Sequence, residues 1–443
     1  MSAHLASLID VKNFGSETIR IGDLNGDGAP DLLFVQNLYG PRVITCLTAT
    51  TIAGDILWQT GKPSRKNGFV YCDLPVQIYD WDNDGRNEVL YVQQSRYAEL
   101  YPDTGYAVEH AKRYEGDATM IVLDGQTGRK KGQFALPAPA DDSFLFADLT
   151  GRGRREDLVV KDRYWNMWGI AHNGRVLWRW EGSVGHFPAT GDVDGDGRDE
   201  VFVGFELIYH DGKVLFEKDS QGHHQDACCM VQLADGTWRL LFGNHGIHCL
   251  NARGKELWHH PLAEAQHVVP GRFRLDSEMQ FMVIDRGQPI RGDYTKRGPA
   301  MLYLYDLKGR ELWRREQPKG SWCAACVKAN WFGPGQPDAA LVYSRSPVVM
   351  VKRGTEMLYR YQAGTPEAIY DGEGNIVDTM TMEYGRKPSA EARNCGFYGL
   401  TADLWGDSRD EVLLFGASSA CVFANARPLQ LPTLYNETLY PGV

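Results

Sequence analysis

The sequence predicts an all-β fold, an eight-bladed β-propeller that spans residues 1–443 as a single domain. Two alternating repeats carry this prediction: an acidic, glycine-rich segment followed by a short apolar strand, and an aromatic hairpin between successive copies. The 48 glycines and the 11% aromatic content fit tight turns between aromatic-rich strands. The apolar pattern lacks a 3.6-residue period, which disfavours helical repeats and α/β folds.

The first repeat reads G-D-x-[DN]-G-D-G-x-x-[DE] and is followed by four or five apolar residues. It is intact as GDLNGDGAPD, YDWDNDGRNE and GDVDGDGRDE, at 22–31, 79–88 and 191–200. Five weaker copies keep its framing. One anchor residue in each copy marks a blade, and the eight anchors are Asp23, Asp80, Asp148, Asp192, Gln232, Arg272, Asn330 and Asp403.

The second repeat is an apolar strand, a D-x-x-G or D-G turn and an aromatic strand, as in IAHNGRVLWRW and LYDLKGRELWRRE. Each copy predicts a hairpin whose glycine takes a positive φ. The shortest anchor spacing, from Asp192 to Gln232, is 40 residues, which is the length of one four-stranded blade. Seven blades is the alternative if one degenerate copy is not a blade.

The three intact acidic segments predict about three structural Ca²⁺ sites. Each has oxygen-bearing side chains at relative positions 0, +2, +4 and +8 and glycines for a sharp turn, which is the hard-oxygen cage that Ca²⁺ prefers. These loops join the first two strands, A and B, of their blades. The predicted ligands are Asp23, Asn25, Asp27 and Asp31, then Asp80, Asp82, Asp84 and Glu88, and finally Asp192, Asp194, Asp196 and Glu200.

The blade topology predicts which face carries function. In a meander of strands A to D, the A–B and C–D turns share one face, and the B–C turns and the crossovers between blades share the other. The expected insertions 93–118, 286–300 and 363–394 all fall on the second face. Loops on a rigid scaffold usually carry function, so the site is expected there, near the central axis.

Histidines precede the anchors of three consecutive blades, as His186, His224 and His267. A lone strand histidine is usually a packing residue, but three at matching depth favour a functional role. The other candidates on this face are Asn37, Lys161, Arg163, Tyr164, His245, Arg345 and Tyr398. Two classes fit: proton transfer on an anionic substrate, or a histidine-bound transition metal. The first is favoured, because suitable carboxylates are expected only on the opposite face.

The stretch 79–304 resembles polysaccharide lyase family 11, the rhamnogalacturonan lyases. The resemblance rests on YDWDNDGRNEV with the following MIVLDGQTGR, on GDVDGDGRDEVFVGFELIYHDGKVLF, on GHHQDA, and on the later ADLWGDSRDEV. It implies a calcium-rich, eight-bladed propeller that cleaves a uronate next to rhamnose by β-elimination. By position, His186 and His224 match family histidines that precede the corresponding blades.

One departure from the family alters the expected substrate. The family carries N-G-T-K before its last acidic motif, and that lysine is a candidate catalytic residue. Here the segment 394–398 reads NCGFY and has no lysine. The expected substrate is therefore a related uronate- and rhamnose-containing glycan or oligosaccharide, rather than the family's endo-cleaved polymer.

The expected roles follow from the chemistry of elimination. His186 or His224 would be the base, Tyr164 or Tyr398 the acid, and Arg163 with Lys161 or a bound cation would neutralise the uronate carboxylate. Asn37, His245, His267 and Arg345 would contact the substrate. The alternatives are a glycoside hydrolase on the same scaffold, or a non-catalytic, calcium-dependent propeller that binds glycans or proteins.

Charge and hydropathy limit the expected partners. The formal net charge of −10 argues against nonspecific nucleic-acid binding, which needs a basic face. The sequence also lacks an apolar run of the ~18 residues that a membrane span requires. Because the N-terminus shows no signal peptide, a cytoplasmic protein acting on carbohydrate is expected, or a secreted one if a signal was removed.

Overall fold

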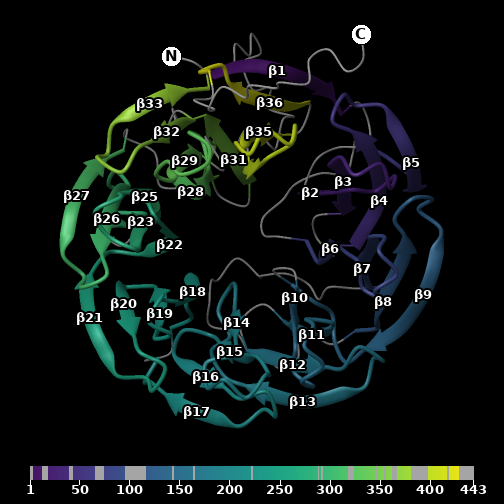
Figure 1. Ribbon diagram of the computed structural model, residues 1–443, viewed down its shortest axis with the longest axis horizontal. Coiled ribbons are helices and arrows are strands. Elements are labelled where there is room, and N and C mark those ends of the chain that lie inside the picture. Colours follow the sequence, from purple (N-terminus) through teal and green to yellow (C-terminus); the bar gives the residue numbers. More distant parts are fainter. Residues whose placement is uncertain are drawn as a thin grey trace, which may run out of the picture.

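Eight four-stranded antiparallel sheets surround a central axis in the computed structural model of the chain (Figure 1). The fold class and the blade count are therefore as predicted. The structure describes residues 3–11, 18–38, 43–64, 74–94, 116–141, 144–162, 165–220, 223–287, 289–290, 293–317, 324–344, 348–353, 356–361, 367–380, 398–416 and 419–428. Within these residues, no helix is long and apolar enough to span a bilayer.

Blades 1 to 4 each run from an innermost strand A to an outermost strand D. Their strands are β2 (Thr18–Gly22), β3 (Asp31–Leu38), β4 (Val43–Thr51) and β5 (Ile56–Gly61); β6 (Val76–Tyr79), β7 (Glu88–Gln94), β8 (Ala118–Asp124) and β9 (Lys130–Leu136); β10 (Phe144–Ala147), β11 (Asp157–Lys161), β12 (Asn166–Ile170) and β13 (Val176–Glu181); and β14 (Ala189–Gly191), β15 (Glu200–Phe202), β16 (Glu206–Ile208) and β17 (Val214–Glu217).

Blades 5 to 8 repeat this order, with one change at the point where the ring closes. Their strands are β18 (Ala227–Gln232), β19 (Trp238–Gly243), β20 (Gly246–Leu250) and β21 (Glu256–Pro261); β22 (Ala265–Gly271), β23 (Gln280–Asp285), β26 (Met301–Asp306) and β27 (Glu311–Glu316); β28 (Ala324–Ala329), β29 (Ala339–Ser344), β32 (Ala368–Tyr370) and β33 (Ile376–Thr379); and β34 (Tyr398–Ala402), β35 (Glu411–Phe415), β36 (Ser419–Asn425) and β1 (Ala3–Asp10).

The ring is closed by strands from the two ends of the described chain. The segment β1 pairs antiparallel with β36 and becomes the outermost strand of blade 8 (Figure 1). The chain continues from β1 in blade 8 to β2, the innermost strand of blade 1. Blades 8 and 1 therefore cannot separate unless the pairing of β1 with β36 breaks.

The topology defines two faces. We call the face with the A–B and C–D turns the A–B face, and the face with the B–C turns and the crossovers between blades the crossover face. The predicted anchors end or directly follow the innermost strands, so the acidic loops are A–B loops as expected.

The predicted insertions agree with this topology in part. Residues 95–115 of the first lie outside the described residues, and the B–C segment of blade 6 contains a hairpin, β24 (Pro289–Ile290) with β25 (Asp293–Arg297). The prediction of a single insertion over 363–394 is wrong. Its residues 368–379 include β32 and β33, the outer strands of blade 7, and a hairpin of β30 (Val348–Arg353) and β31 (Glu356–Tyr361) precedes them.

The aromatic hairpins lock neighbouring blades together. The Nε1 of Trp258 on β21 donates 3.1 Å to the carbonyl of Leu307, in the C–D turn of the next blade. Gly309 of that turn has φ +78°, and a Cβ there would lie 2.5 Å from Cγ of Trp258. The D-x-x-G turn thus carries glycine for two reasons, because it needs positive φ and because it faces the ring of the preceding tryptophan.

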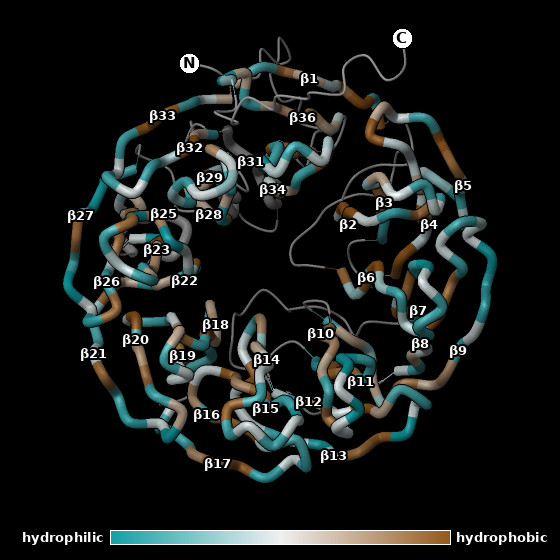
Figure 2. The backbone as a smooth tube through the Cα atoms, viewed as in Figure 1, coloured by the Kyte–Doolittle hydropathy of each residue, from teal (hydrophilic) through white to brown (hydrophobic). Residues whose placement is uncertain are grey.

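Burial differs between the outermost strands and the strands further in. The outermost strands have exposed residues, whereas several strands further in are buried along their whole length. Along β13, Trp178 is buried between the exposed Val176 and Arg179, and Figure 2 shows hydrophilic and hydrophobic stretches along the outer rim. By contrast, all five residues of β11 and of β12 are buried, because both faces of these strands pack against neighbouring blades.

Candidate functional site

Two neighbouring crossovers bring the predicted histidines together on the crossover face. His186 lies between β13 and β14, and His224 lies between β17 and β18. The backbone N–H of His186 donates 3.1 Å to the carbonyl of Gln225, and the hydroxyl of Ser183 donates 2.7 Å to the carbonyl of His223. These bonds hold the two crossovers side by side.

A carboxylate lies between the two histidines. The Oδ1 of Asp226 is 3.5 Å from Nε2 of His224 and 3.8 Å from Nε2 of His186, and the two imidazole rings are 5.4 Å apart. We call these three residues the histidine–aspartate cluster. Its side chains are mostly buried, with exposed fractions of 19% for His186, 18% for His224 and 7% for Asp226.

The B–C turn of blade 5 completes the surroundings of this cluster. Asn244 is 8% exposed, and its Nδ2 donates to the carbonyl of His224 and, at 3.2 Å, to Oδ2 of Asp226. The ring of His245 lies 4.4 Å from that of His223. Of the four predicted histidines, His186 and His224 contact the same carboxylate, whereas His245 contacts His223 rather than the cluster itself.

Charge around the cluster favours the ionised form of Asp226. Burial alone would raise the pKa of this carboxyl, but its hydrogen bond with His224 and the charges of His224, His186 and Arg286 outweigh burial and lower it. Arg286 follows β23 and forms an ion pair of 3.0 Å with Glu264. The site thus combines an anionic carboxylate, two imidazoles and a nearby guanidinium.

The remaining predicted residues are more dispersed. Lys161 is 2% exposed and its Nζ donates 2.9 Å to the carbonyl of Asp162, so its ammonium is buried. Asn37 is also buried, at 1% exposed. His267 lies in β22 opposite Ile284. Arg163, Tyr164 and Arg345 lie outside the described residues.

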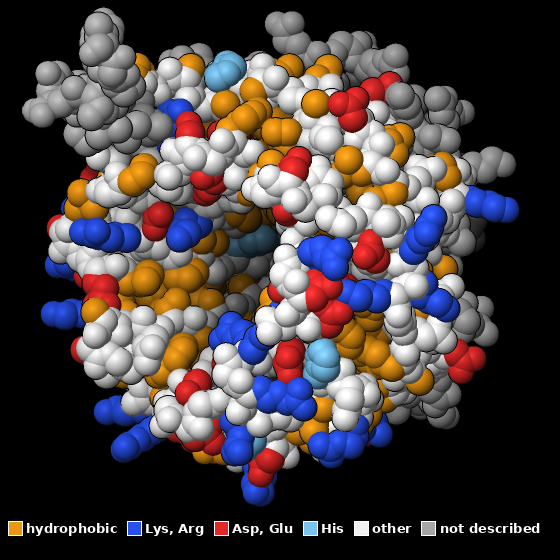
Figure 3. All heavy atoms as spheres, turned by 45° about the vertical axis from the view of Figure 1, so that its right-hand side comes forward, with side chains coloured by type: hydrophobic (Ala, Val, Ile, Leu, Met, Phe, Trp, Pro, Cys, Tyr) orange, Lys and Arg blue, Asp and Glu red, His pale blue; other side chains and the backbone are white. Residues whose placement is uncertain are grey.

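Tyr398 begins β34 of blade 8 and stacks on Phe415, with ring centroids 5.8 Å apart. Blade 8 lies opposite blade 4 in the ring, so Tyr398 lies across the central axis from His186 (Figure 1). Figure 3 shows a hollow at the centre of the molecule, with acidic and basic side chains mixed around it.

The residue that sequence reasoning missed is Asp226. The expectation that suitable carboxylates are found only on the opposite face is wrong, because Asp226 lies on the crossover face beside both histidines. The signal was present in GHHQDA: residues i and i+2 of an extended segment point to the same side, so His224 and Asp226 form a pair. What the sequence did not show was that Asp226 would also lie beside His186, at 3.8 Å.

The cluster suits two kinds of chemistry. Imidazole next to a carboxylate can accept and return a proton, with the carboxylate fixing the ring. The same three groups lie within 4.8 Å of one another and offer ligand atoms for a metal ion. Both roles, proton transfer and metal binding, would use the three side chains that the two crossovers already bring together.

The acidic loops on the opposite face share one backbone arrangement. In the loop 192–200, Oδ2 of Asp192 accepts 3.0 Å from the N–H of Gly197, and Oε2 of Glu200 accepts 2.9 Å from the N–H of Val193. Asp23 and Asp31 make the matching bonds in the loop 23–31, at 2.9 Å each, with Gly28 and Leu24. The first and last acids thus fold the loop, and the side chains between them converge.

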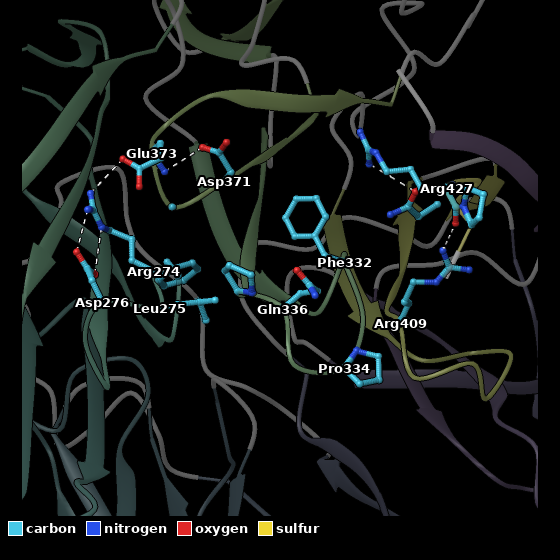
Figure 4. A pocket seen from close by; sticks show the side chains of 15 residues that line it. Arg274, Leu275, Asp276, Phe332, Pro334, Gln336, Asp371, Glu373, Arg409 and Arg427 are labelled. Atoms are coloured by element: carbon cyan, nitrogen blue, oxygen red, sulfur yellow. Dashed lines mark hydrogen bonds and ion pairs between the residues drawn. The ribbon is translucent and has the colours of Figure 1, made fainter. Parts of the chain in front are cut away.

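A cavity of about 760 Å³ also opens on the A–B face, between blades 6, 7 and 8 (Figure 4). Its wall includes Arg274, which pairs with Asp276 at 2.9 Å and with Glu373 at 3.1 Å. Arg427 pairs with the fully buried Asp378 at 2.6 Å. Its arginines are thus engaged with acids of the fold, and the cavity lies on the face opposite the histidine–aspartate cluster.

Comparisons with known proteins agree with the fold and the resemblance. No family model matches the chain. The rhamnogalacturonan exolyase YesX of Bacillus subtilis is 23% identical over 250 residues, and the rhamnogalacturonan endolyase YesW of the same organism is 26% identical over 255 residues. Each match covers 46% of this chain and 40% of the relative, so the chain is aligned with less than half of either protein.

The solved structures extend the similarity to nearly the whole chain. The crystal structure of YesX has a TM-score of 0.58 at 19% identity and covers 94% of this chain and 72% of its own. That of YesW has a TM-score of 0.56 at 17% identity, over 96% and 74%. The chain resembles the rhamnogalacturonan lyases. BamB from Moraxella catarrhalis, with a TM-score of 0.52 at 11% identity, shows that the scaffold is also found outside the lyases.

Proposed function

We propose that this chain is a polysaccharide or oligosaccharide lyase that cleaves a uronate- and rhamnose-containing glycan by β-elimination. The observation that carries the proposal is the histidine–aspartate cluster, which supplies proton-transfer groups on the face where loops collect. The similarity to YesX and YesW supports the same reaction class, since both are named as rhamnogalacturonan lyases.

The proposed reaction needs two proton movements. His224, fixed by Asp226, takes the proton from C5 of the uronate, and the electron pair of that C–H bond forms the C4=C5 double bond. The bond from C4 to the glycosidic oxygen breaks, and the leaving oxygen keeps its electron pair. His186, on the same side of the central axis as His224, gives that oxygen a proton.

A cation must offset the uronate carboxylate, because the C5 proton is too weakly acidic beside an unneutralised anion. The charge of Arg286 is among those that lower the pKa of Asp226. We therefore propose Arg286, which also forms an ion pair of 3.0 Å with Glu264, as the partner of the uronate carboxylate, with Arg163 as a further candidate outside the described residues. Lys161 suits this role less well, because its ammonium is buried.

We further propose that calcium stabilises the propeller through the acidic loops. The loop 192–200 fits the ion: Oε1 of Glu200 is buried and accepts no hydrogen bond from the described residues, and Asp192, Asp194 and Glu200 each offer one carboxylate oxygen within 4.8 Å of the others. In the loop 23–31, Asp23 and Asp27 lie close enough to Asp31 to raise its pKa, after burial as the main cause. Calcium would supply positive charge at both loops.

The test of the lyase proposal is incubation with rhamnogalacturonan, gum and ulvan oligosaccharides. A lyase leaves an unsaturated uronate, which absorbs in the ultraviolet and has the mass of the chain fragment without added water. Products with the mass of water added would show a glycoside hydrolase instead. Binding without any product would support the non-catalytic, glycan-binding alternative.

A further inference from the structure

The acidic loop of blade 2 contains an ammonium group from the chain itself. Lys131 lies on β9, and its Nζ is 2.6 Å from Oδ2 of Asp82, 2.8 Å from Oε1 of Glu88 and 3.4 Å from Oδ2 of Asp84. The Glu88 side chain is only 2% exposed, so the contact reaches into the loop rather than across its surface. Three of the four acids of this loop therefore converge on one cation.

Lys131 occupies a structural position that recurs around the ring. Leu123 pairs with Lys130 and Val122 pairs with Gly132, so Lys131 is the extra residue of a β-bulge on the outermost strand. Six other blades have a bulge at the same place, and each extra residue is apolar. These residues are Leu57, Leu177, Leu215, Leu257, Leu312 and Val377.

The acidic loop of blade 4 is the matched comparison. Its sequence, DVDGDGRDE, has the same pattern as DWDNDGRNE in blade 2. Arg86 and Arg198 occupy equivalent positions, and each lies 3.6 Å from a carboxylate oxygen, of Asp84 and Asp196 respectively. The loops differ at the bulge, where blade 4 has Leu215. They also differ in the C–D turn, where His210 of blade 4 lies 3.6 Å from Asp196 and 3.9 Å from Glu200.

A second cation approaches the loop of blade 2 from its neighbour. The Nη2 of Arg154, in the A–B loop of blade 3, lies 3.8 Å from Oδ1 of Asp80. All four acids of the loop 80–88 are thus within 4 Å of a lysine or arginine nitrogen. In blade 4, Glu200 keeps a buried oxygen that accepts no hydrogen bond from the described residues.

We propose that Lys131 is a built-in cation that replaces calcium in the acidic loop of blade 2. The inference rests on calcium binding by the loops of blades 1 and 4. A calcium ion entering this loop must either displace the ammonium from three charge-assisted contacts or share the same carboxylates with it against charge repulsion. The intact sequence motif at 79–88 therefore does not mark a third equivalent calcium site.

The test compares calcium binding by the wild-type chain and by Lys131→Leu, which installs the residue found at this bulge in five other blades. Each protein is stripped with a chelator, dialysed and titrated calorimetrically with calcium, and bound calcium is counted by elemental analysis. We expect two tight sites in the wild type and one more in Lys131→Leu. The control is Lys130→Leu, which changes the exposed neighbouring lysine and should leave the number of ions unchanged.

The other outcomes are equally informative. Three equivalent tight sites in the wild type, or no additional ion in folded Lys131→Leu, would overturn the proposal. Lys131→Gln, which keeps a polar side chain without the charge, serves if the leucine variant does not fold, and it must also gain an ion. Binding of one ion by the variants and none by the wild type would keep the role of Lys131 and refute calcium binding by the other two loops. None of these readouts depends on lyase activity.

Discussion

Oδ1 of Asp226 lies 3.5 Å from Nε2 of His224, two residues earlier in the same crossover, and Nδ2 of Asn244 donates 3.2 Å to the other carboxylate oxygen. This arrangement fixes one imidazole on the crossover face and leaves it close to His186. The proposed proton transfer depends on this arrangement, and substitution of each side chain in turn tests it.

We predict that His224→Ala and His186→Ala each lower lyase activity about 100-fold or more, the size typical of removing a proton-transfer group. Asp226→Asn, which keeps the shape but removes the charge that orients His224, should lose about 10-fold or more. Rates are measured from the ultraviolet absorbance of the product, with melting temperatures checked in parallel. His259→Ala, on the outer strand β21, is the control, and equal losses in all variants would contradict the assignment.

We predict that active protein contains no stoichiometric zinc or manganese. The Asp226 carboxylate already lies 3.5 Å from His224 and accepts a hydrogen bond of 3.2 Å from Asn244, so contacts within the protein hold the cluster together without a metal ion. Elemental analysis of active protein measures this directly. Stoichiometric zinc or manganese that is lost in His186→Ala would instead make the histidines metal ligands.

We predict that chelation lowers the melting temperature and that added calcium restores it. An ion that binds only the folded state adds about 2.7 kcal/mol of stability per site at about 100 times its dissociation constant. Asp194→Asn should reduce the shift between chelated and calcium-loaded protein, whereas Asp211→Asn, in the neighbouring C–D turn, should not. An unchanged melting temperature after complete chelation would refute the structural role of calcium.

We predict that Gly309→Ala destabilises the fold more than Gly335→Ala. Both glycines have positive φ, +78° and +74°, but a Cβ at position 309 would meet Cγ of Trp258 at 2.5 Å, and at position 335 it would meet no atom within 4 Å. Both variants should lose about 1 kcal/mol through backbone strain, and Gly309→Ala should lose a further 1–3 kcal/mol or so through overpacking. Chemical denaturation of both variants measures the difference, and equal losses would show that the packing contact contributes nothing.

We predict a pH-dependent stability term from Glu206, which is 6% exposed. Burial, and to a lesser extent Glu217, raise its pKa from 4.5 to about 8. The folded state therefore keeps a proton that the unfolded chain releases above its ordinary pKa, so stability is highest at low pH and falls as pH rises toward about 8.

Glu206→Gln removes this term and should flatten the pH dependence by about 4 kcal/mol at most between about pH 5 and pH 8. Unfolding free energies at several pH values compare the variant with wild type. Glu217→Gln, which removes only the exposed neighbouring charge, should change the slope less. A wild-type slope retained in Glu206→Gln would assign the effect to another group.

The sequence by itself determined the number of blades and the place of most strands. Each acidic loop and each D-x-x-G hairpin is specified by residues within about a dozen positions, because positive φ, the Asp–backbone bonds of the loop and strand alternation are local properties. The outer strands of blade 7 were not predicted, because their turn, in YDGEGN, lies inside the range 363–394 that was expected to be an insertion. The closing strand β1 carries neither repeat, so its partner β36 could not be inferred.

Tertiary structure decided which residues share a site. His186 and Asp226 are 40 residues apart and meet because adjacent crossovers lie side by side in the ring. Lys131 reaches the loop 80–88 because antiparallel pairing places the outer strand of blade 2 beside it. The acidic motif is identical in kind in blades 2 and 4, yet only one of these loops holds an ammonium. A local pattern specifies the backbone of such a loop, while the charge inside it depends on side chains that arrive from elsewhere in the chain.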